Sequence, residues 1–186
     1  MTMRVEQARR AVFLDRDGTV IVDKHYLSDP AEVELERGAA SGLAHLTRLG
    51  LRLIGVTNQS GVAKGMFDML AVHKVNDRVA ELLMPYGVSI EHWYVCPHDG
   101  DTGCVCRKPA PGMMYEAARD RSIDLTQSFV IGDKLSDVEL GTATGAAGIL
   151  VETGKGAALS VAARAQGHLV VRDLDEAAAA IAAMLE

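Results

Sequence analysis

The sequence lacks long hydrophobic runs, an excess of basic charge and many cysteines, and each absence excludes a class of protein. No stretch approaches the ~18 uninterrupted apolar residues of a membrane span, and the first residues lack the apolar core of a secretory signal. A formal charge of −6 argues against nucleic-acid and membrane-surface binders, which carry a basic face. The three cysteines are an odd number clustered in one short stretch, which argues against a disulfide framework. We therefore expect a cytoplasmic protein without nucleic-acid or membrane partners.

The chain also contains no internal repeat and no proline- or serine-rich linker, so we expect a single domain. Its 186 residues, 48% of them hydrophobic, suffice for one substantial core. Residues 1–10 are polar and are expected to form a flexible lead-in, with the domain spanning residues 11–186. We expect the protein to be a monomer.

Short apolar runs alternate with helical patterns along the whole domain. The expected strands span residues 11–14, 52–57, 92–95, 129–132, 148–152 and 168–171. The expected helices span residues 38–49, 69–84, 111–122, 136–144, 157–166 and 173–185. Alternating strands and helices predict an α/β fold, in which a mainly parallel sheet carries helices on both faces.

Two carboxylates follow the first expected strand directly, in Asp15-Arg16-Asp17-Gly18-Thr19. A buried strand that ends in charged residues is how open α/β sheets build ligand sites. Acids two residues apart suit a hard cation such as Mg²⁺, and one of them can act as a nucleophile while the other transfers protons. Alone, the pattern is equally compatible with an ordinary Asp-Gly turn.

Three further segments carry polar side chains that suit phosphate or metal. Thr57-Asn58-Gln59-Ser60-Gly61 follows the second strand and could hold phosphate, although a polar turn would have the same composition. Arg107 and Lys108 are adjacent cations that could equally be a solvated pair. Residues 132–137 follow the fourth strand with two acids, which could belong to a metal site or cap the next helix.

Residues 15, 57 and 133 all lie at the carboxyl ends of expected parallel strands, so they share one edge of the sheet. Together these segments offer carboxylates for Mg²⁺, a hydroxyl and a lysine for phosphate oxygens, and a nucleophile. They are the parts of a phosphoryl-transfer site.

Four features occur in this order along the chain: the motif D-x-D-G-T, the strand-end threonine, the loop lysine and G-D-x-x-x-D. In these features the chain resembles the haloacid dehalogenase-like superfamily. The resemblance implies a three-layer, Rossmann-like fold. Asp17 favours a phosphatase, because dehalogenases of the superfamily lack this second aspartate. The resemblance further implies that Asp15 attacks phosphorus and forms an aspartyl-phosphate. Asp17 would protonate the leaving alkoxide and then deprotonate the attacking water.

The same resemblance assigns the remaining site residues. Mg²⁺ would be held by Asp15, the backbone carbonyl of Asp17 and Asp133, with Asp137 orienting the site from behind. Thr57 and Lys108 would hold the transferring phosphoryl group.

The loop at residues 96–106 has a metal-binding composition. Cys96, His98, Cys104 and Cys106 suit tetrahedral Zn²⁺ and leave no open coordination position, so the site would be structural. Bound zinc would order the loop that presents the two adjacent cations, Arg107 and Lys108. A surface loop with incidental cysteines is the alternative.

The intervals between Asp15, Thr57 and Lys108 are largely used by the expected strands and helices, which leaves no room for a cap domain. We therefore expect an open site whose specificity comes from short segments at its rim. The candidate rim segments are Asp23, Lys24, His25 and Tyr26, then residues 60–67, and Arg107. Asn58, Gln59 and Ser60 are further candidates for binding substrate. The cations of the rim segments suit a small phosphorylated sugar with a second phosphate.

Within the superfamily, the uncapped members with a zinc loop are of two main kinds, heptose 1,7-bisphosphate 7-phosphatases and histidinol-phosphate phosphatases. Residues 57–65, 106–113, 132–137 and 152–156 resemble the first kind, which serves nucleotide-activated heptose synthesis. The resemblance implies that Arg107 contacts substrate and that Lys134 lies beside the phosphate. A histidinol-phosphate phosphatase, a non-catalytic phospho-ligand or zinc-dependent interaction module, and a phosphotransferase are the alternatives.

Overall fold

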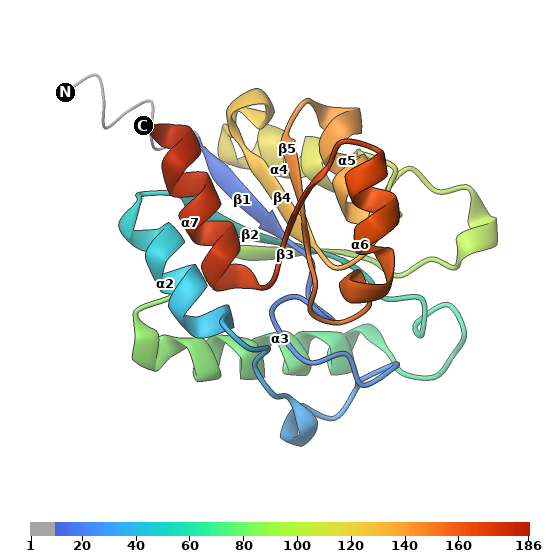
Figure 1. Ribbon diagram of the computed structural model, residues 1–186. Coiled ribbons are helices and arrows are strands. Elements are labelled where there is room, and N and C mark those ends of the chain that lie inside the picture. Colours follow the sequence, from blue (N-terminus) through green and yellow to red (C-terminus); the bar gives the residue numbers. More distant parts are fainter. Residues whose placement is uncertain (1–9) are drawn as a thin grey trace.

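The computed structural model describes residues 10–186 (Figure 1), so the expected lead-in falls almost entirely outside the described residues. Six strands form one sheet: β1 (Ala11–Leu14), β2 (Arg52–Asn58), β3 (His92–Cys96), β4 (Phe129–Gly132), β5 (Ala147–Val151) and β6 (Leu169–Val171). Six α-helices accompany them: α2 (Ala39–Arg48), α3 (Met69–Leu83), α4 (Gly112–Arg121), α5 (Leu135–Thr144), α6 (Gly156–Ala165) and α7 (Leu174–Leu185). Short 3-10 turns are η1 (Pro30–Glu32), η2 (Met84–Tyr86), η3 (Gly100–Thr102) and η4 (Leu125–Gln127).

All paired strands are parallel, and their order is β3-β2-β1-β4-β5-β6. The chain starts at the centre of the sheet, builds outward to β3, returns to β4 beside β1 and then builds in the other direction. The pairing of β1 with β4 continues one residue beyond the strand, because the Asp15 N–H donates to the Ile131 carbonyl at 3.0 Å. A crevice opens where the order reverses, outside the carboxyl ends of β1 and β4.

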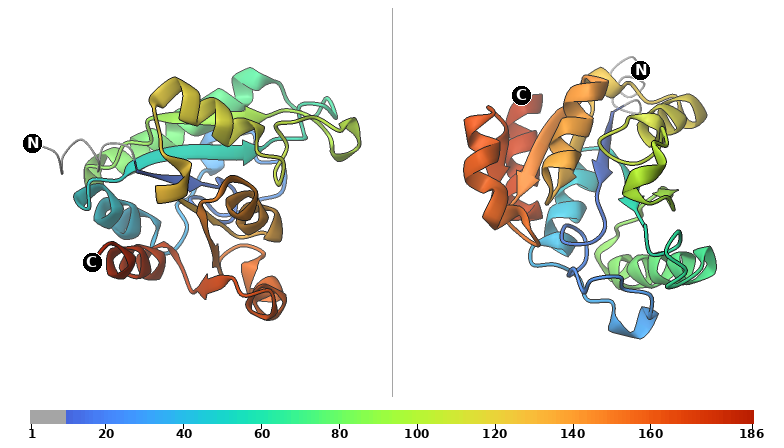
Figure 2. Two further views of the ribbon diagram at one scale, coloured as in Figure 1. Left: turned by 90° about the horizontal axis from the view of Figure 1, so that it is seen from above. Right: turned by 90° about the vertical axis from the view of Figure 1, so that its right-hand side faces the viewer.

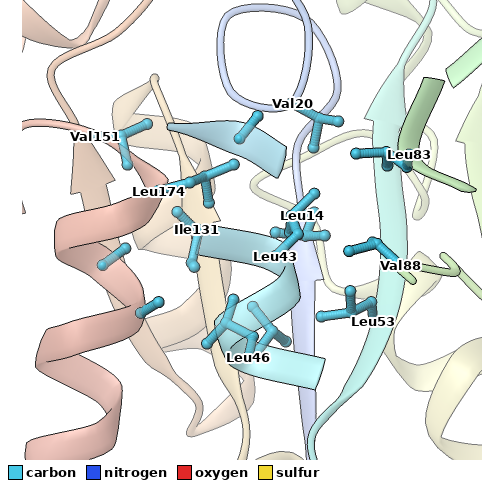
Figure 3. Close-up of a cluster of buried hydrophobic side chains, with 14 of the residues drawn as sticks. Leu14, Val20, Leu43, Leu46, Leu53, Leu83, Val88, Ile131, Val151 and Leu174 are labelled. Atoms are coloured by element: carbon cyan, nitrogen blue, oxygen red, sulfur yellow. The ribbon is translucent and has the colours of Figure 1, made fainter. Parts of the chain in front are cut away.

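The β1 strand is apolar throughout because both of its faces are covered. Successive side chains of a strand point to opposite faces. Val12 and Leu14 belong to the cluster built with α2, α3 and α7, whereas Phe13 belongs to the cluster built with α4. Figure 3 shows Leu14 beside Leu43 of α2, and the turned views in Figure 2 show helices on both sides of the sheet. The fold therefore has three layers.

The α/β fold predicted from the sequence is confirmed, with helix and strand ends shifted by at most one residue. In the described chain, the segment from Asp15 to Gly38 contains only η1 and two isolated bridges. The segment from Gln59 to Asp68 contains no helix or strand. Neither segment has the secondary structure of a cap domain. Within residues 10–186, no helix combines the length and apolar character that crossing a bilayer requires.

Candidate active site

Segments that are remote in the sequence meet at the carboxyl edge of the sheet, around a cavity of about 360 Å³. Most of the residues predicted to form the site line this cavity. They are Asp15, Asp17, Asp23, His25, Tyr26, Asn58, Gln59, Ser60, Arg107, Lys108 and Lys134. Thr57, Asp133 and Asp137 are fully buried beneath them.

Asp15 is a buried carboxylate held between two ammonium groups. Its Oδ1 lies 2.6 Å from Lys108 Nζ, and its Oδ2 lies 3.2 Å from Lys134 Nζ. Burial acts to raise the pKa of Asp15, but the two lysines outweigh it and hold that pKa well below its usual range. Asp15 is therefore an anion at neutral pH, as a nucleophile must be.

Lys108 is fixed both at its side chain and at its backbone. Its Nζ also contacts Asp137 Oδ1 at 2.7 Å and donates to the Val56 carbonyl at 2.8 Å. Burial acts to lower the pKa of Lys108, but the charges of Asp137 and Asp15 raise it overall. Asn58 accepts from the Lys108 N–H at 3.1 Å and donates to the Lys108 carbonyl at 3.3 Å. Asn58, predicted as a substrate contact, thus positions Lys108 with both ends of its amide.

The three groups predicted to hold Mg²⁺ each place an oxygen beside the ammonium group of Lys134 in this structure. Lys134 Nζ lies 3.2 Å from Asp15 Oδ2, 3.0 Å from Asp133 Oδ1 and 3.3 Å from the Asp17 carbonyl oxygen. Two carboxylates and a carbonyl are the hard oxygen donors that Mg²⁺ prefers, so the residues fit this metal. Burial, with the charge of Asp15, raises the pKa of Asp133 to about 7.

The loop after β5 encloses Asp133, a role that the sequence did not predict for residues 152–156. The Lys155 N–H donates to Asp133 Oδ2 at 2.8 Å, and Thr153 Oγ1 donates to the Gly18 carbonyl at 2.7 Å. A Cβ on Gly18 or on Gly154 would collide with Asp133 Oδ2. The signal available in the sequence was Thr-Gly-Lys at the end of a fifth strand, which places it at the same sheet edge.

A single amide connects the predicted phosphate-binding hydroxyl to the predicted acid. Gln59 Nε2 donates to Thr57 Oγ1 and to Asp17 Oδ2, both at 2.8 Å. Behind them, Asp137 Oδ2 accepts from the Lys134 N–H at 3.1 Å and so caps α5. Asp137 therefore joins the helix start to Lys108.

Positively charged side chains line the rim of the cavity, but one of the predicted rim residues is not among them. Lys24 does not line the cavity, because its ammonium is bound at 2.6 Å by Glu34 and at 2.7 Å by the Glu32 carbonyl. Lys155, absent from the sequence-based set, does line the cavity, and its Nζ lies 3.9 Å from Asp23 Oδ2.

Arg107 and Tyr26 are each tied to a neighbouring loop. Arg107 Nη1 donates to the His98 carbonyl at 3.2 Å. The Tyr26 hydroxyl accepts from Lys64 Nζ at 2.6 Å, and hydrogen bonds from Lys64 and Ser60 lower the pKa of Tyr26. These contacts fix two walls of the cavity.

The sulfur and nitrogen atoms of the 96–106 loop are gathered into one cluster. The Sγ atoms of Cys96, Cys104 and Cys106 lie 3.3–3.7 Å apart, and His98 Nδ1 lies 3.2 Å from Cys106 Sγ. Zinc about 2.3 Å from each sulfur would set Sγ–Sγ separations of about 3.8 Å, close to those observed. Burial raises the pKa of Cys96 to about 12. Burial acts in the same direction on Cys104, but the Arg107 N–H and the neighbouring thiols lower its pKa to about 6. The four side chains fit a closed tetrahedral metal site.

A buried carboxylate flanked by two lysines at the switch point of a doubly wound sheet is the arrangement expected of phosphoryl-transfer enzymes that use aspartate. The HAD-hydrolase-like family model matches residues 105–177. The D-glycero-beta-D-manno-heptose-1,7-bisphosphate 7-phosphatase of Photorhabdus laumondii is 37% identical over 179 residues, covering 92% of this chain and 94% of that protein. The Pseudomonas aeruginosa protein of the same name is 32% identical over 175 residues, covering 94% and 98%.

A solved structure agrees with these relatives. The D,D-heptose 1,7-bisphosphate phosphatase of B. bronchiseptica, complexed with magnesium and phosphate, superposes with a TM-score of 0.84 at 33% identity, covering 94% of this chain and 99% of that one. The chain belongs to the haloacid dehalogenase-like superfamily of phosphoric monoester hydrolases, in the family of these heptose-bisphosphate phosphatases.

Proposed function

We propose that the protein removes the 7-phosphate of D-glycero-D-manno-heptose 1,7-bisphosphate, in the cytoplasm and as a monomer, and so serves nucleotide-activated heptose synthesis. The names of its relatives point to this substrate. The observation that carries the chemistry is Asp15, an anion held between Lys108 and Lys134 at the cavity floor.

In the first step, Asp15 attacks the phosphorus of the 7-phosphate and forms an aspartyl-phosphate. The leaving sugar oxygen takes a proton from Asp17. Lys108 and Lys134 lie within ion-pair distance of the nucleophile, so their charges also oppose the negative charge that collects on the phosphoryl oxygens. Thr57 lies beneath this point. Its Oγ1 accepts from Gln59 Nε2, which leaves the hydroxyl hydrogen free to donate to a phosphoryl oxygen.

In the second step, water attacks the aspartyl-phosphate and gives its proton to Asp17. The bond between Asp15 and phosphorus breaks, and inorganic phosphate leaves. Asp17 lines the cavity two residues from the nucleophile, so it can reach the reacting oxygen in both steps. It acts as acid in the first step and as base in the second. The open site admits the water that this step requires, which favours a phosphatase over a phosphotransferase.

Mg²⁺ would be held by Asp15, the Asp17 carbonyl and Asp133, and when bound it supplies positive charge against the transferring phosphoryl group. Asp137 stands behind these ligands and holds Lys108 in place. Displacement of the Lys134 ammonium from the same oxygens would bring that side chain toward the phosphate.

Zinc at Cys96, His98, Cys104 and Cys106 would be structural. Arg107 follows the last of these ligands and bonds to the carbonyl of another, so an ordered loop holds Arg107 at the cavity. Arg107 and Lys155 are the rim cations that we assign to the second phosphate of the substrate. His25, Tyr26 and Ser60 would contact the sugar between the two phosphates.

The test is phosphate release with Mg²⁺ from both anomers of heptose 1,7-bisphosphate and from histidinol phosphate, assayed in parallel. We expect a preference for the bisphosphate because two rim cations match its second phosphate. A preference for histidinol phosphate would reject the substrate and keep the catalytic assignment. No hydrolysis of either ester would reject the enzyme and favour a phospho-ligand-binding module.

A further inference from the structure

Arg16, which lies between the two site aspartates, is the largest fully buried side chain among the described residues. A buried charge needs partners. Arg16 Nε donates to Asp17 Oδ2 at 3.1 Å, and its Nη2 donates to Asp17 Oδ1 at 3.3 Å. Its Nη1 donates to Asn76 Oδ1 at 3.0 Å. The guanidinium therefore forks onto the predicted acid and is anchored from behind by α3.

Asn76 serves this anchor at the expense of its own hydrogen bonding. The residue is buried, and within the described chain its Nδ2 has no hydrogen-bond partner. Exchanging the two ends of the amide would place a donor against the guanidinium, so the oxygen must face Arg16. A buried polar group left without a partner in a native protein calls for an explanation. Here the explanation is the fixed position of Arg16.

The two oxygens of Asp17 are not equivalent. Oδ2 accepts from Arg16 Nε at 3.1 Å and from Gln59 Nε2 at 2.8 Å, which engages both of its lone pairs. Among residues 10–186, Oδ1 accepts only the longer bond from Arg16 Nη2 at 3.3 Å, and the donors of this part of the chain leave one of its lone pairs free. Since Asp17 lines the cavity, Oδ1 is the oxygen that can exchange a proton with substrate.

We propose that Arg16 is a positioning residue which, anchored by Asn76, confines proton transfer at Asp17 to Oδ1. The inference rests on the proposed phosphatase activity. In the first step, Asp15 bonds to phosphorus while the bond between phosphorus and the sugar oxygen breaks. The proton on Oδ1 passes to that leaving sugar oxygen. In the second step, water gives a proton to Oδ1 while its oxygen bonds to phosphorus and Asp15 is released. Both aspartates are restored.

The test is a double-mutant cycle of Arg16→Met with Asp17→Asn, using whichever of heptose 1,7-bisphosphate and histidinol phosphate the unaltered protein hydrolyses. In the native background, Arg16→Met should lower kcat by about 100-fold, the scale of general acid–base catalysis, and leave KM within about threefold. In the Asp17→Asn background it should lower kcat by less than about threefold, because Arg16 acts only through Asp17.

Arg52 supplies a matched control. Its Nε and Nη2 fork onto Glu91 at 2.9 and 2.6 Å, at the opposite edge of the sheet. Arg52→Met should leave kcat within about twofold, since it breaks the same kind of pair outside the site. An equal loss of kcat in Arg52→Met would show that the loss in Arg16→Met comes from lower stability of the protein in general. That result would overturn the proposal.

Asn76→Leu keeps both charges and removes only the anchor, so it tests the proposal even if Arg16→Met does not fold. We expect Asn76→Leu to lower kcat by about tenfold in the native background and to have no effect in Asp17→Asn. A kcat at the native level in Asn76→Leu, or equal losses of kcat in both backgrounds, would refute the role. If the unaltered protein hydrolyses neither ester, the proposed phosphatase fails instead, and the two failures are distinguished.

Discussion

Burial and the neighbouring lysines have opposite effects on the ionisation of Asp15. Removal from water disfavours a carboxylate anion, and two ammonium groups restore it. Lys108 and Lys134 are themselves held by Asp137 and Asp133, so two lysines and three carboxyl groups share one largely buried network. Asp15 is therefore ionised before substrate arrives, as the proposed nucleophile must be.

Asp15→Asn should abolish turnover, by about 10⁴-fold or more, because an amide cannot form the aspartyl-phosphate. The fold should persist, since the side chain keeps its size and each lysine keeps another carboxylate. Phosphate release and circular dichroism measure the two effects. Asp120→Asn, on the exposed part of α4, is the matched control and should retain full activity. Near-native turnover in Asp15→Asn would refute the nucleophile.

The sequence predicted the site residues that follow buried strands, because a strand end fixes both their position and their direction. Asp15 and Asp133 are of this kind. Lys24 could not be placed, because the partner that binds its ammonium, Glu34, lies further along an irregular loop. Asn58 was placed at the cavity, but its bonds to the Lys108 backbone were not predicted, because only the fold brings the two segments together.

At the scale of elements, the 96–106 loop brings its four candidate zinc ligands together in one cluster. It has a single short turn, η3, and few apolar contacts of its own. The loop leads directly into Arg107 and Lys108, so its order determines where these cations stand. A metal would order it by cross-linking its two ends.

Zinc removal, with Mg²⁺ resupplied, should lower turnover by about 100-fold, because a displacement of about 1 Å at Lys108 suffices for such a loss. Metal analysis confirms removal, and phosphate release measures turnover. Cys104→Ser should reproduce the loss without chelator, and added Zn²⁺ should restore the unaltered protein alone. Full activity in protein verified to be zinc-free would contradict the coupling.

The loop after β5 makes a second prediction at this scale. Gly154→Ala should weaken Mg²⁺ binding by about tenfold, because the new Cβ would displace the Asp133 carboxylate. Calorimetric titration with Mg²⁺ measures this. Gly167→Ala is the control, since Gly167 also has a positive φ (+83°) but faces open space, so it shares only the backbone strain. Equal Mg²⁺ affinity in both variants would show that the Gly154 contact is unimportant.

At the scale of the whole molecule, the alternation of strands and helices predicted the parallel sheet, and the parallel sheet predicted one shared edge for the motifs. The order of strands was beyond the sequence. The pairing of Val12 with Phe129, and of Asp15 with Ile131, joins residues with most of the chain between them. No local pattern encodes these contacts, yet they create the crevice that holds the site.

The opposite edge of the sheet has its own ionic network, whose three residues do not line the cavity. Glu91 Oε2 lies 2.6 Å from Arg52 Nη2 and 3.4 Å from Arg121 Nη1, joining the starts of β2 and β3 to the end of α4. Hydrogen bonding to Arg52 lowers the pKa of Glu91 below its ordinary value of 4.5. A carboxylate whose folded-state pKa is lowered stabilises the protein above its unfolded-state pKa, and loses this effect as the pH falls through the folded-state value.

Glu91→Gln should therefore destabilise the protein at neutral pH, by at most about 1 kcal/mol because the pair is partly exposed. The difference in melting temperature between the two proteins should shrink as the pH falls below 4.5, while kcat at neutral pH stays unchanged. Glu116→Gln, at an exposed position of α4, should melt like the unaltered protein at every pH. A difference for Glu91→Gln that persists undiminished in acid would show that packing, and not the charge of Glu91, holds the three elements together.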